Sequence, residues 1–293
     1  MNEQKITQLL PVRQEMALEG AYLAQGLAGM SARIQRPLVI TNFLTDKNGV
    51  IAKAIKPHEF QVPPELKNPS DWRLFQELMA QADVVISGAA YLQRVAVPGF
   101  HGQEILFQFE PGREFAELGE WRIKSGFKKR SPDLAVVARR LDFHFPAELI
   151  QSGRRIFIFT SQSVADSEKA RALKASGVTI VASGKEDVDG NRLIDFLSNG
   201  MGYRVIMMAT GPGVLDLLLT AKRLDLLYVT EVQVEIPLDD PNSVQTMLPG
   251  NKKVNELEEF TLTHRYLQKN VSTEDGSITS QFFLRYDRKD ANL

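Results

Sequence analysis

Short apolar runs rich in β-branched residues alternate with segments of helical spacing along most of the chain. The strand-like runs lie at residues 37–43, 83–87, 134–138, 155–159, 178–181, 203–209 and 226–230. Between two of these runs, one helical stripe is formed by Trp72, Phe75, Leu78, Met79 and Ala82. Strands that alternate with helices in this way predict an α/β fold with three layers (α/β/α) and a mostly parallel sheet.

The C-terminal part of the chain has a different pattern. Residues 260–266 and 280–286 both alternate apolar and polar positions, and Glu274-Asp275-Gly276 lies between them. An Asp-Gly pair between alternating segments is typical of a β-hairpin. We therefore expect the mixed sheet to end in a C-terminal antiparallel hairpin.

The first residues of the chain lack this order. Apolar positions over residues 14–30 have mixed helical spacing, but three glycines weaken any helix there. We expect a partly helical N-terminal extension over residues 1–35 and a single domain over residues 36–293. The extension is either loosely packed or an arm that docks on the body of the chain or on a second subunit.

Residues 99–131 form the least regular segment, with a strand expected at residues 103–109. A basic run from Arg122 to Arg130 ends this segment and includes Phe127. Basic residues with an interleaved aromatic residue suit either contact with nucleic acid or a solvated loop. Neighbouring glutamates offset the charge and favour the solvated loop.

Composition and charge narrow the class of protein. Lys plus Arg number 35 and Asp plus Glu number 36, so the net charge is −1 and no basic excess points to a polyanionic partner. Cysteine is absent, which excludes disulfides, thiolate nucleophiles and Cys-type metal sites. The histidines (His58, His101, His144 and His264) are scattered without metal-ligand spacing. Since we find neither a signal peptide nor a membrane-spanning run, we expect a cytoplasmic protein that binds no nucleic acid and no membrane.

The strongest local signal for chemistry is the turn Thr210-Gly211-Pro212-Gly213-Val214-Leu215. It follows an expected strand and opens an expected helix. Glycines at such a place allow close backbone approach, and the free N–H groups of the helix start attract phosphate. The turn is either a phosphate-binding cradle or simply a tight turn that starts a helix.

The ends of other expected strands supply further candidate residues for the same binding site. These are Gly88 and Ala89, Ala138 and Arg139, and Thr160 and Ser161. In open α/β sheets, ligands bind beyond the carboxyl ends of the strands. Arg139 would pair with a ribose 2′-phosphate and the two hydroxyls would donate to it, although a solvated loop is the alternative for the arginine.

Asp46 is the carboxylate that follows the first strand. In the turn that it opens, it is either a group that orients a heterocycle and relays a proton, or a residue that stabilises its own turn.

The ordered set of segments resembles a known family. Thr45-Asp46-Lys47-Asn48-Gly49-Val50-Ile51-Ala52 resembles its Ser-x-Asp-Gly-x-Ile-Ala turn, and residues 82–89 resemble its Ala-Asp-Ala-Val-Leu-Val-Gly-Ala segment. Residues 205–215 are similar to its strand, Glu-Gly-Gly-Pro turn and helix, and residues 224–228 to its Val-Asp-Glu-Leu strand. The family is the reductase domain of the bifunctional deaminase/reductase of riboflavin biosynthesis, which has a dihydrofolate reductase-like fold.

This resemblance implies an NADPH-dependent reductase, commonly a homodimer, that transfers hydride to a pyrimidine, a pterin or a similar planar heterocycle. It implies a cofactor site at the strand ends listed above and at Thr210, Gly211, Pro212, Gly213, Val214 and Leu215. Asn42, Thr45 and Gly49 would lie near the substrate, and Asp46 would be the catalytic residue. The protein would supply orientation and electrostatics, and the nicotinamide the chemistry.

The sequence also departs from the family. Ala209-Thr210-Gly211-Pro212 stands where the family has Glu-Gly-Gly-Pro, and Tyr91 stands where a small hydroxyl residue is common. These changes favour a second hypothesis, in which the chain has kept the fold as a non-catalytic nucleotide-binding or regulatory protein.

Overall fold

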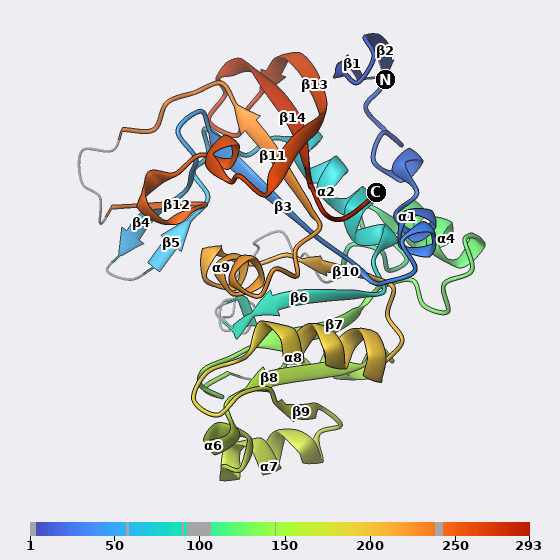
Figure 1. The fold of residues 1–293 in the computed structure, drawn as a ribbon, viewed down its shortest axis with the longest axis vertical. Coiled ribbons are helices and arrows are strands. Elements are labelled where there is room, and N and C mark those ends of the chain that lie inside the picture. Colours follow the sequence, from blue (N-terminus) through green and yellow to red (C-terminus); the bar gives the residue numbers. More distant parts are fainter. Residues whose placement is uncertain (1–3, 57–58, 90, 93–106, 144, 238–242) are drawn as a thin grey trace. The chain divides into compact units, whose positions relative to one another are not determined.

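The computed structural model describes residues 4–56, 59–89, 91–92, 107–143, 145–237 and 243–293. The chain forms two compact units (Figure 1). Unit 1 contains the residues up to Ile34, Ile40–Leu78 and Leu224–Leu293, and unit 2 contains Gln35–Val39 and Met79–Arg223. The division at residue 35 stays a prediction.

Unit 2 is built on parallel strands in the order β10-β6-β7-β8-β9. Their bounds are Val84–Gly88 for β6, Asp133–Val137 for β7, Ile156–Thr160 for β8, Thr179–Ala182 for β9 and Val205–Met208 for β10. All neighbouring pairs in this order are parallel. The inner strands are buried on both faces, which explains why the sequence shows them as continuous apolar runs.

The helices of unit 2 follow these strands. They are α4 (Ala116–Lys124), α5 (Ala147–Gln151), α6 (Gln162–Ala165), α7 (Glu168–Ala175), α8 (Gly190–Asp195), η3 (Phe196–Gly200) and α9 (Pro212–Thr220). Ser167 caps α7, because its Oγ accepts the N–H of Ala170 at 3.2 Å. Gly177, with φ of 92°, adopts the left-handed conformation just after this helix.

The basic run of the sequence lies mostly at the surface, with Lys124 and Lys128 exposed and Lys129 and Arg130 half-buried. Arg122 is buried, and its Nη1 donates to the carbonyl oxygens of Ala80 and Ala82, both at 2.7 Å. Arg130 donates to the carbonyl oxygens of Phe109 and Ala116. Of the strand expected at 103–109, residues 103–106 lie outside the described residues, and 107–109 do not form a strand.

Unit 1 contains strands in the order β2-β1-β13-β14-β11-β3. These strands are β1 (Lys5–Leu10), β2 (Gln14–Ala17), β3 (Leu38–Asp46), β11 (Leu226–Val232), β13 (Phe260–Ser272) and β14 (Ile278–Arg288). β11 pairs parallel with β3 and antiparallel with β14, and β13 and β14 form the expected C-terminal hairpin. A second sheet joins β12 (Val244–Thr246), β4 (Val50–Lys56) and β5 (Glu59–Gln61).

The helices of unit 1 are short except for one. They are η1 (Leu23–Gln25), α1 (Leu27–Arg33), α2 (Pro69–Gln81), η4 (Pro249–Asn251) and η5 (Val254–Glu256). Asn68 caps α2, because its Oδ1 accepts the N–H of Asp71 at 2.9 Å. Pro69 then occupies the first helical position, where its missing N–H costs nothing.

The N-terminal segment is anchored on unit 1. β1 pairs with β13 and with β2, so the helix expected at residues 14–17 is wrong. The buried carboxylate of Glu77 accepts the N–H groups of Gly20 at 2.6 Å and Tyr22 at 3.0 Å. The segment is therefore an arm that docks on the body of its own chain.

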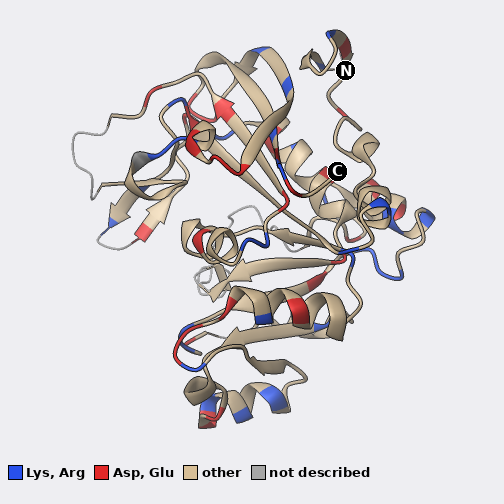
Figure 2. Cartoon of the chain, in the orientation of Figure 1, with Lys and Arg blue, Asp and Glu red and all other residues tan. Residues whose placement is uncertain are grey.

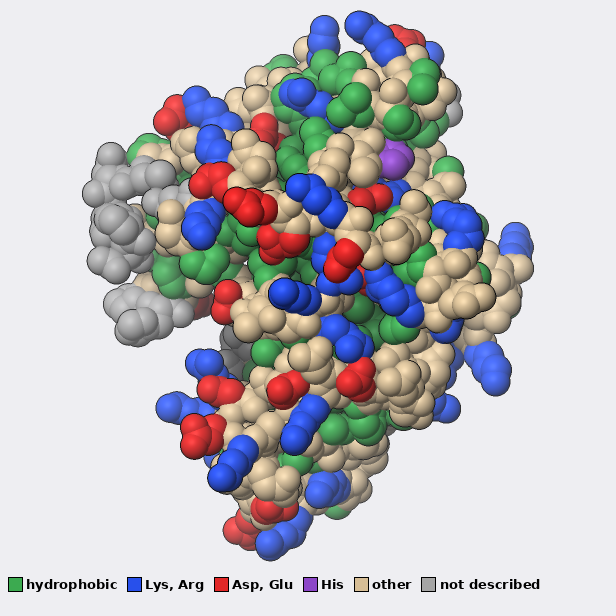
Figure 3. Space-filling model, viewed as in Figure 1, with side chains coloured by type: hydrophobic (Ala, Val, Ile, Leu, Met, Phe, Trp, Pro, Cys, Tyr) green, Lys and Arg blue, Asp and Glu red, His purple; other side chains and the backbone are tan. Residues whose placement is uncertain are grey.

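These elements confirm an α/β fold with a mostly parallel, mixed sheet and a C-terminal antiparallel hairpin. Positive and negative residues are interspersed along the cartoon in Figure 2 and over the face drawn in Figure 3. Within the described ranges, no helix has both the length and the apolar character that a membrane crossing requires.

Candidate functional site

The predicted cofactor residues lie in unit 2, at the carboxyl ends of its parallel strands. Gly88 ends β6, Ala138 follows β7, Thr160 ends β8, and Thr210 lies just after β10. Because the strands are parallel, these ends share one edge of the sheet. The arrangement required for a phosphate-binding rim is therefore present.

The loops after β6 and β10 are in direct contact. A Cβ atom added at Gly88 would lie 2.7 Å from Oγ1 of Thr210. A glycine at position 88 is therefore needed for close packing rather than for an unusual backbone conformation.

The turn before α9 is open. Gly211 is the N-cap of α9 and Pro212 is its first residue. A Cβ atom added at Gly211 or Gly213 would meet nothing within 4 Å. The backbone here is accessible to a ligand, beside the partial positive charge of a helix N-terminus.

The end of β8 presents hydroxyl groups. Thr160 has an exposed fraction of 0%, and among the described residues its Oγ1 has no hydrogen-bond partner. Ser161 Oγ lies 3.3 Å from Ser163 Oγ. A buried hydroxyl without a partner costs free energy unless water or a ligand satisfies it, so Thr160 is a strong binding candidate.

Not every predicted cofactor residue offers a side chain. Ala138 and Leu215 are buried in the core of unit 2 and can contribute only backbone groups. Tyr91 is also buried in a core cluster with Leu92 and Phe107. Arg139 is 85% exposed, and its Nε donates to Oδ1 of Asp187 at 3.0 Å.

Asp46 lies in unit 1, and its carboxylate is occupied by backbone groups. Its Oδ1 accepts the N–H groups of Asn48 and Val50, both at 2.8 Å, and its Oδ2 accepts the N–H of Ile236 at 2.9 Å. The residue is fully buried. This geometry matches the alternative in which Asp46 stabilises its own turn.

The other predicted substrate residues surround this turn in unit 1. Gly49 has φ of 85°, a conformation that favours glycine, and its N–H donates to the carbonyl oxygen of Asp46. Thr45 is buried, and Asn42 is half-buried on β3. Asn42 contacts a further ionisable group.

That group is Asp71, in the first turn of α2. Asn68 caps this helix, and Asp71 is only 8% exposed. Burial raises the pKa of Asp71 to about 6, although hydrogen bonds from Thr230 and Asn42 oppose the rise. No hydrogen-bond partner for its Oδ1 is found in the described residues. The residue therefore combines a shifted pKa with a free acceptor.

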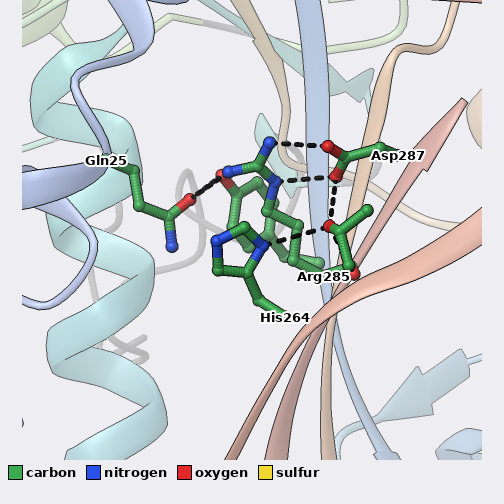
Figure 4. Close-up of polar contacts among 6 residues, drawn as sticks. Gln25, His264, Arg285 and Asp287 are labelled. Carbon is green, nitrogen blue, oxygen red and sulfur yellow. Dashed lines mark hydrogen bonds and ion pairs between the residues drawn. The ribbon is translucent and has the colours of Figure 1, made fainter. Parts of the chain in front are cut away.

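A second polar network of unit 1 connects the arm to the hairpin (Figure 4). The carboxylate of Asp287 is bound by Nε of Arg285 at 2.8 Å and Nη2 at 2.7 Å. Nη1 of the same arginine donates to Oε1 of Gln25 in η1 at 3.1 Å, and Tyr228 donates to that oxygen at 2.6 Å.

At the other end of this network, Thr263 Oγ1 donates to Asp287 at 2.8 Å and lies 3.1 Å from Nδ1 of His264. Burial and the charge of Arg285 lower the pKa of His264. Arg285 and Asp287 neutralise each other, and Gln25 of the arm accepts hydrogen bonds from Tyr228 on β11 and Arg285 on β14. We therefore interpret the network as an anchor for the arm.

Comparison with known proteins identifies relatives by fold. No family model matches the sequence, and no curated protein matches it either. A pyrimidine reductase-like protein from Corynebacterium diphtheriae is 19% identical with a TM-score of 0.56, over 86% of this chain and 92% of that one. The riboflavin biosynthesis reductase Rib7 of Saccharomyces cerevisiae is 13% identical with a TM-score of 0.54, over 91% and 99% of the two chains.

RibD of Acinetobacter baumannii is 12% identical with a TM-score of 0.55 over 87% of this chain. The chain spans only 59% of the length of that protein. At these identities the likeness concerns the fold. The chain has the α/β fold of these solved structures.

Proposed function

We propose that this chain is an NADPH-dependent reductase that transfers hydride to a pyrimidine, a pterin or a similar planar heterocycle. The observation that carries the proposal is the shared carboxyl edge of the parallel strands in unit 2, where Gly88 ends β6, Thr160 ends β8 and Thr210 follows β10. This edge is where α/β sheets bind nucleotides. The reductase neighbours in the comparison support the same reaction class.

The residues of this edge fit a dinucleotide. The open backbone at Gly211 and Gly213 suits a pyrophosphate, which binds through main-chain N–H groups. The unpartnered hydroxyl of Thr160 offers a hydrogen bond to a ribose or a phosphate. When bound, the nicotinamide would supply the hydride.

Unit 1 holds a carboxyl group with a shifted pKa. Burial raises the pKa of Asp71 to about 6, so this group keeps its proton to a higher pH than an ordinary carboxyl group. The carboxylate of Asp46 is occupied by backbone N–H groups, and we assign it a turn-stabilising role.

The substrate class follows from the free acceptors beside this carboxyl group. In the described residues, Oδ1 of Asp71 and Oδ1 of Asn42 are both buried without hydrogen-bond partners. The two side chains are hydrogen-bonded to each other. Adjacent acceptors suit a ring that carries neighbouring N–H donors, as aminopyrimidines and pterins do.

A second candidate function is a nucleotide-binding regulatory protein without turnover. It is favoured by the carboxylate of Asp46, which three backbone N–H groups occupy. It is also favoured by Ala209, which stands where the family has glutamate.

An oxidation assay separates the two functions. NADPH absorbance would be followed with the purified chain and a panel of pterins, pyrimidines and quinones. Substrate-dependent oxidation of NADPH supports the reductase. Saturable NADPH binding without oxidation of any panel member favours the regulatory protein. The homodimer and the cytoplasmic location stay predictions.

A further inference from the structure

An ion pair lies over the carboxyl end of β8 in unit 2. Arg139 follows β7, and Asp187 lies between β9 and α8. Nε of Arg139 and Oδ1 of Asp187 are 3.0 Å apart. Since β8 lies between β7 and β9 in the sheet, the pair crosses the end of the strand that carries Thr160.

The loop that carries Asp187 is held in place by backbone contacts. The N–H of Ser183 donates to the carbonyl oxygen of Thr160 at 2.9 Å, and the N–H of Gln162 donates to that of Gly184 at 2.9 Å. A Cβ atom added at Gly184 would lie 1.8 Å from the carbonyl oxygen of Asp187, so the loop folds tightly on itself. The position of Asp187 over β8 is therefore fixed by the fold of the loop.

The groups around this ion pair are those that recognise a phosphate monoester. Hydroxyls of Ser161 and Thr160 lie at the end of β8, and the guanidinium of Arg139 is accessible to solvent. Arginine binds phosphate through directed N–H groups. In this structure, one of those N–H groups is taken by a carboxylate.

The two members of the pair have opposite preferences for nicotinamide cofactors. In dinucleotide-binding folds, an acidic side chain accepts the ribose 2′-hydroxyl of NADH, and an arginine accommodates the 2′-phosphate of NADPH. A 2′-phosphate beside Arg139 would have to displace Asp187 and would feel the repulsion of a like charge. Because an exposed ion pair is weak, the exchange is feasible but reduces affinity.

We propose that Asp187 is a specificity-determining residue, which competes with the cofactor 2′-phosphate for Arg139 and thereby reduces the preference for NADPH over NADH. This inference rests on the proposed function. It predicts that the chain binds both NADPH and NADH, and that Asp187 reduces the difference between their affinities.

The test measures dissociation constants for NADPH, NADH and adenosine 2′,5′-bisphosphate at fixed, low ionic strength. Asp187→Asn is expected to lower the dissociation constants of NADPH and the bisphosphate about fivefold. The dissociation constant of NADH should stay unchanged or rise. Arg139→Ala is expected to weaken NADPH about tenfold and to change NADH less than about twofold. Asp142→Asn is the matched control, since Asp142 forms a similar exposed ion pair with Lys169.

The outcomes separate this inference from the proposed function. The competition is contradicted, while the cofactor site stands, if Asp187→Asn changes the dissociation constant of NADPH by less than about twofold. It is also contradicted if the dissociation constants of NADPH and NADH change equally. The same holds if Asp142→Asn produces an equal gain, because the effect is then general surface charge. If the unmodified chain binds neither cofactor, the proposed function and this inference fail together.

Discussion

A Cβ atom at Gly88 would lie 2.7 Å from Oγ1 of Thr210. This contact joins the loop after β6 to the loop after β10 and brings two candidate cofactor loops together. The contact also allows the packing of these two loops to be tested by substitution.

We expect Gly88→Ala to destabilise the chain by about 1–3 kcal/mol, because the new methyl group overpacks the contact. The double variant Gly88→Ala/Thr210→Ala should recover most of this loss, since the opposing γ atoms are removed. Denaturant unfolding measures both. An additive effect of the two substitutions would show that the residues do not pack against each other.

The turn before α9 predicts a different result. A side chain at Gly211 has open space, so Gly211→Val should keep the fold and cost no more than about 1 kcal/mol, the penalty of valine at a helix N-cap. It should lower NADPH affinity more than about tenfold, because the side chain would occupy the approach of a pyrophosphate to the backbone. Gly29→Ala in α1 is a control outside this turn. Unchanged NADPH affinity in Gly211→Val would move the site elsewhere.

Parallel strands and their shared edge follow from sequence pattern alone. The inner strands of unit 2 are buried on both faces, so β6, β7 and β8 appear as uninterrupted apolar runs that are easily recognised. Parallel pairing then places their carboxyl ends together. The arm is less predictable, because β1 is a strand through its pairing with β13 near the other end of the chain.

The buried carboxyl group of Asp71 was also hidden from sequence reasoning. A Ser or Asp near a helix start normally indicates a cap, and Asp71 lies in such a place. Its burial and its contacts with Asn42 and Thr230 depend on the pairing of β3 with β11. The local signal in the sequence is Asn68, directly before Pro69. Because Asn68 caps the helix, Asp71 is not needed as a cap.

The raised pKa of Asp71 predicts that stability depends on pH. Its folded pKa of about 6 lies above the ordinary value of 3.8, so the folded state binds more protons between these values. Stability should therefore fall as the pH rises from about 4 to about 6, by up to about 1.4 kcal/mol per unit. Asp71→Asn should remove this part of the pH dependence in thermal or urea unfolding. An identical slope in the variant would rule out Asp71 as its source.

Asp46 should behave as a structural residue. Asp46→Ala leaves three backbone N–H groups without their acceptor, so it should cost at least about 3 kcal/mol. Asp290→Ala, an exposed control, should change the stability by less than about 0.5 kcal/mol. A stable Asp46→Ala protein that has lost only turnover would contradict the structural role and support a catalytic role for Asp46.

The most direct test of the central claim is a fluorescence titration of the purified chain with NADPH and NADH. The account predicts saturable binding of NADPH, tighter than that of NADH, and its loss in Gly211→Val while the fold is retained. Absence of binding for both nucleotides by the folded chain would contradict a cofactor site at the carboxyl edge of unit 2.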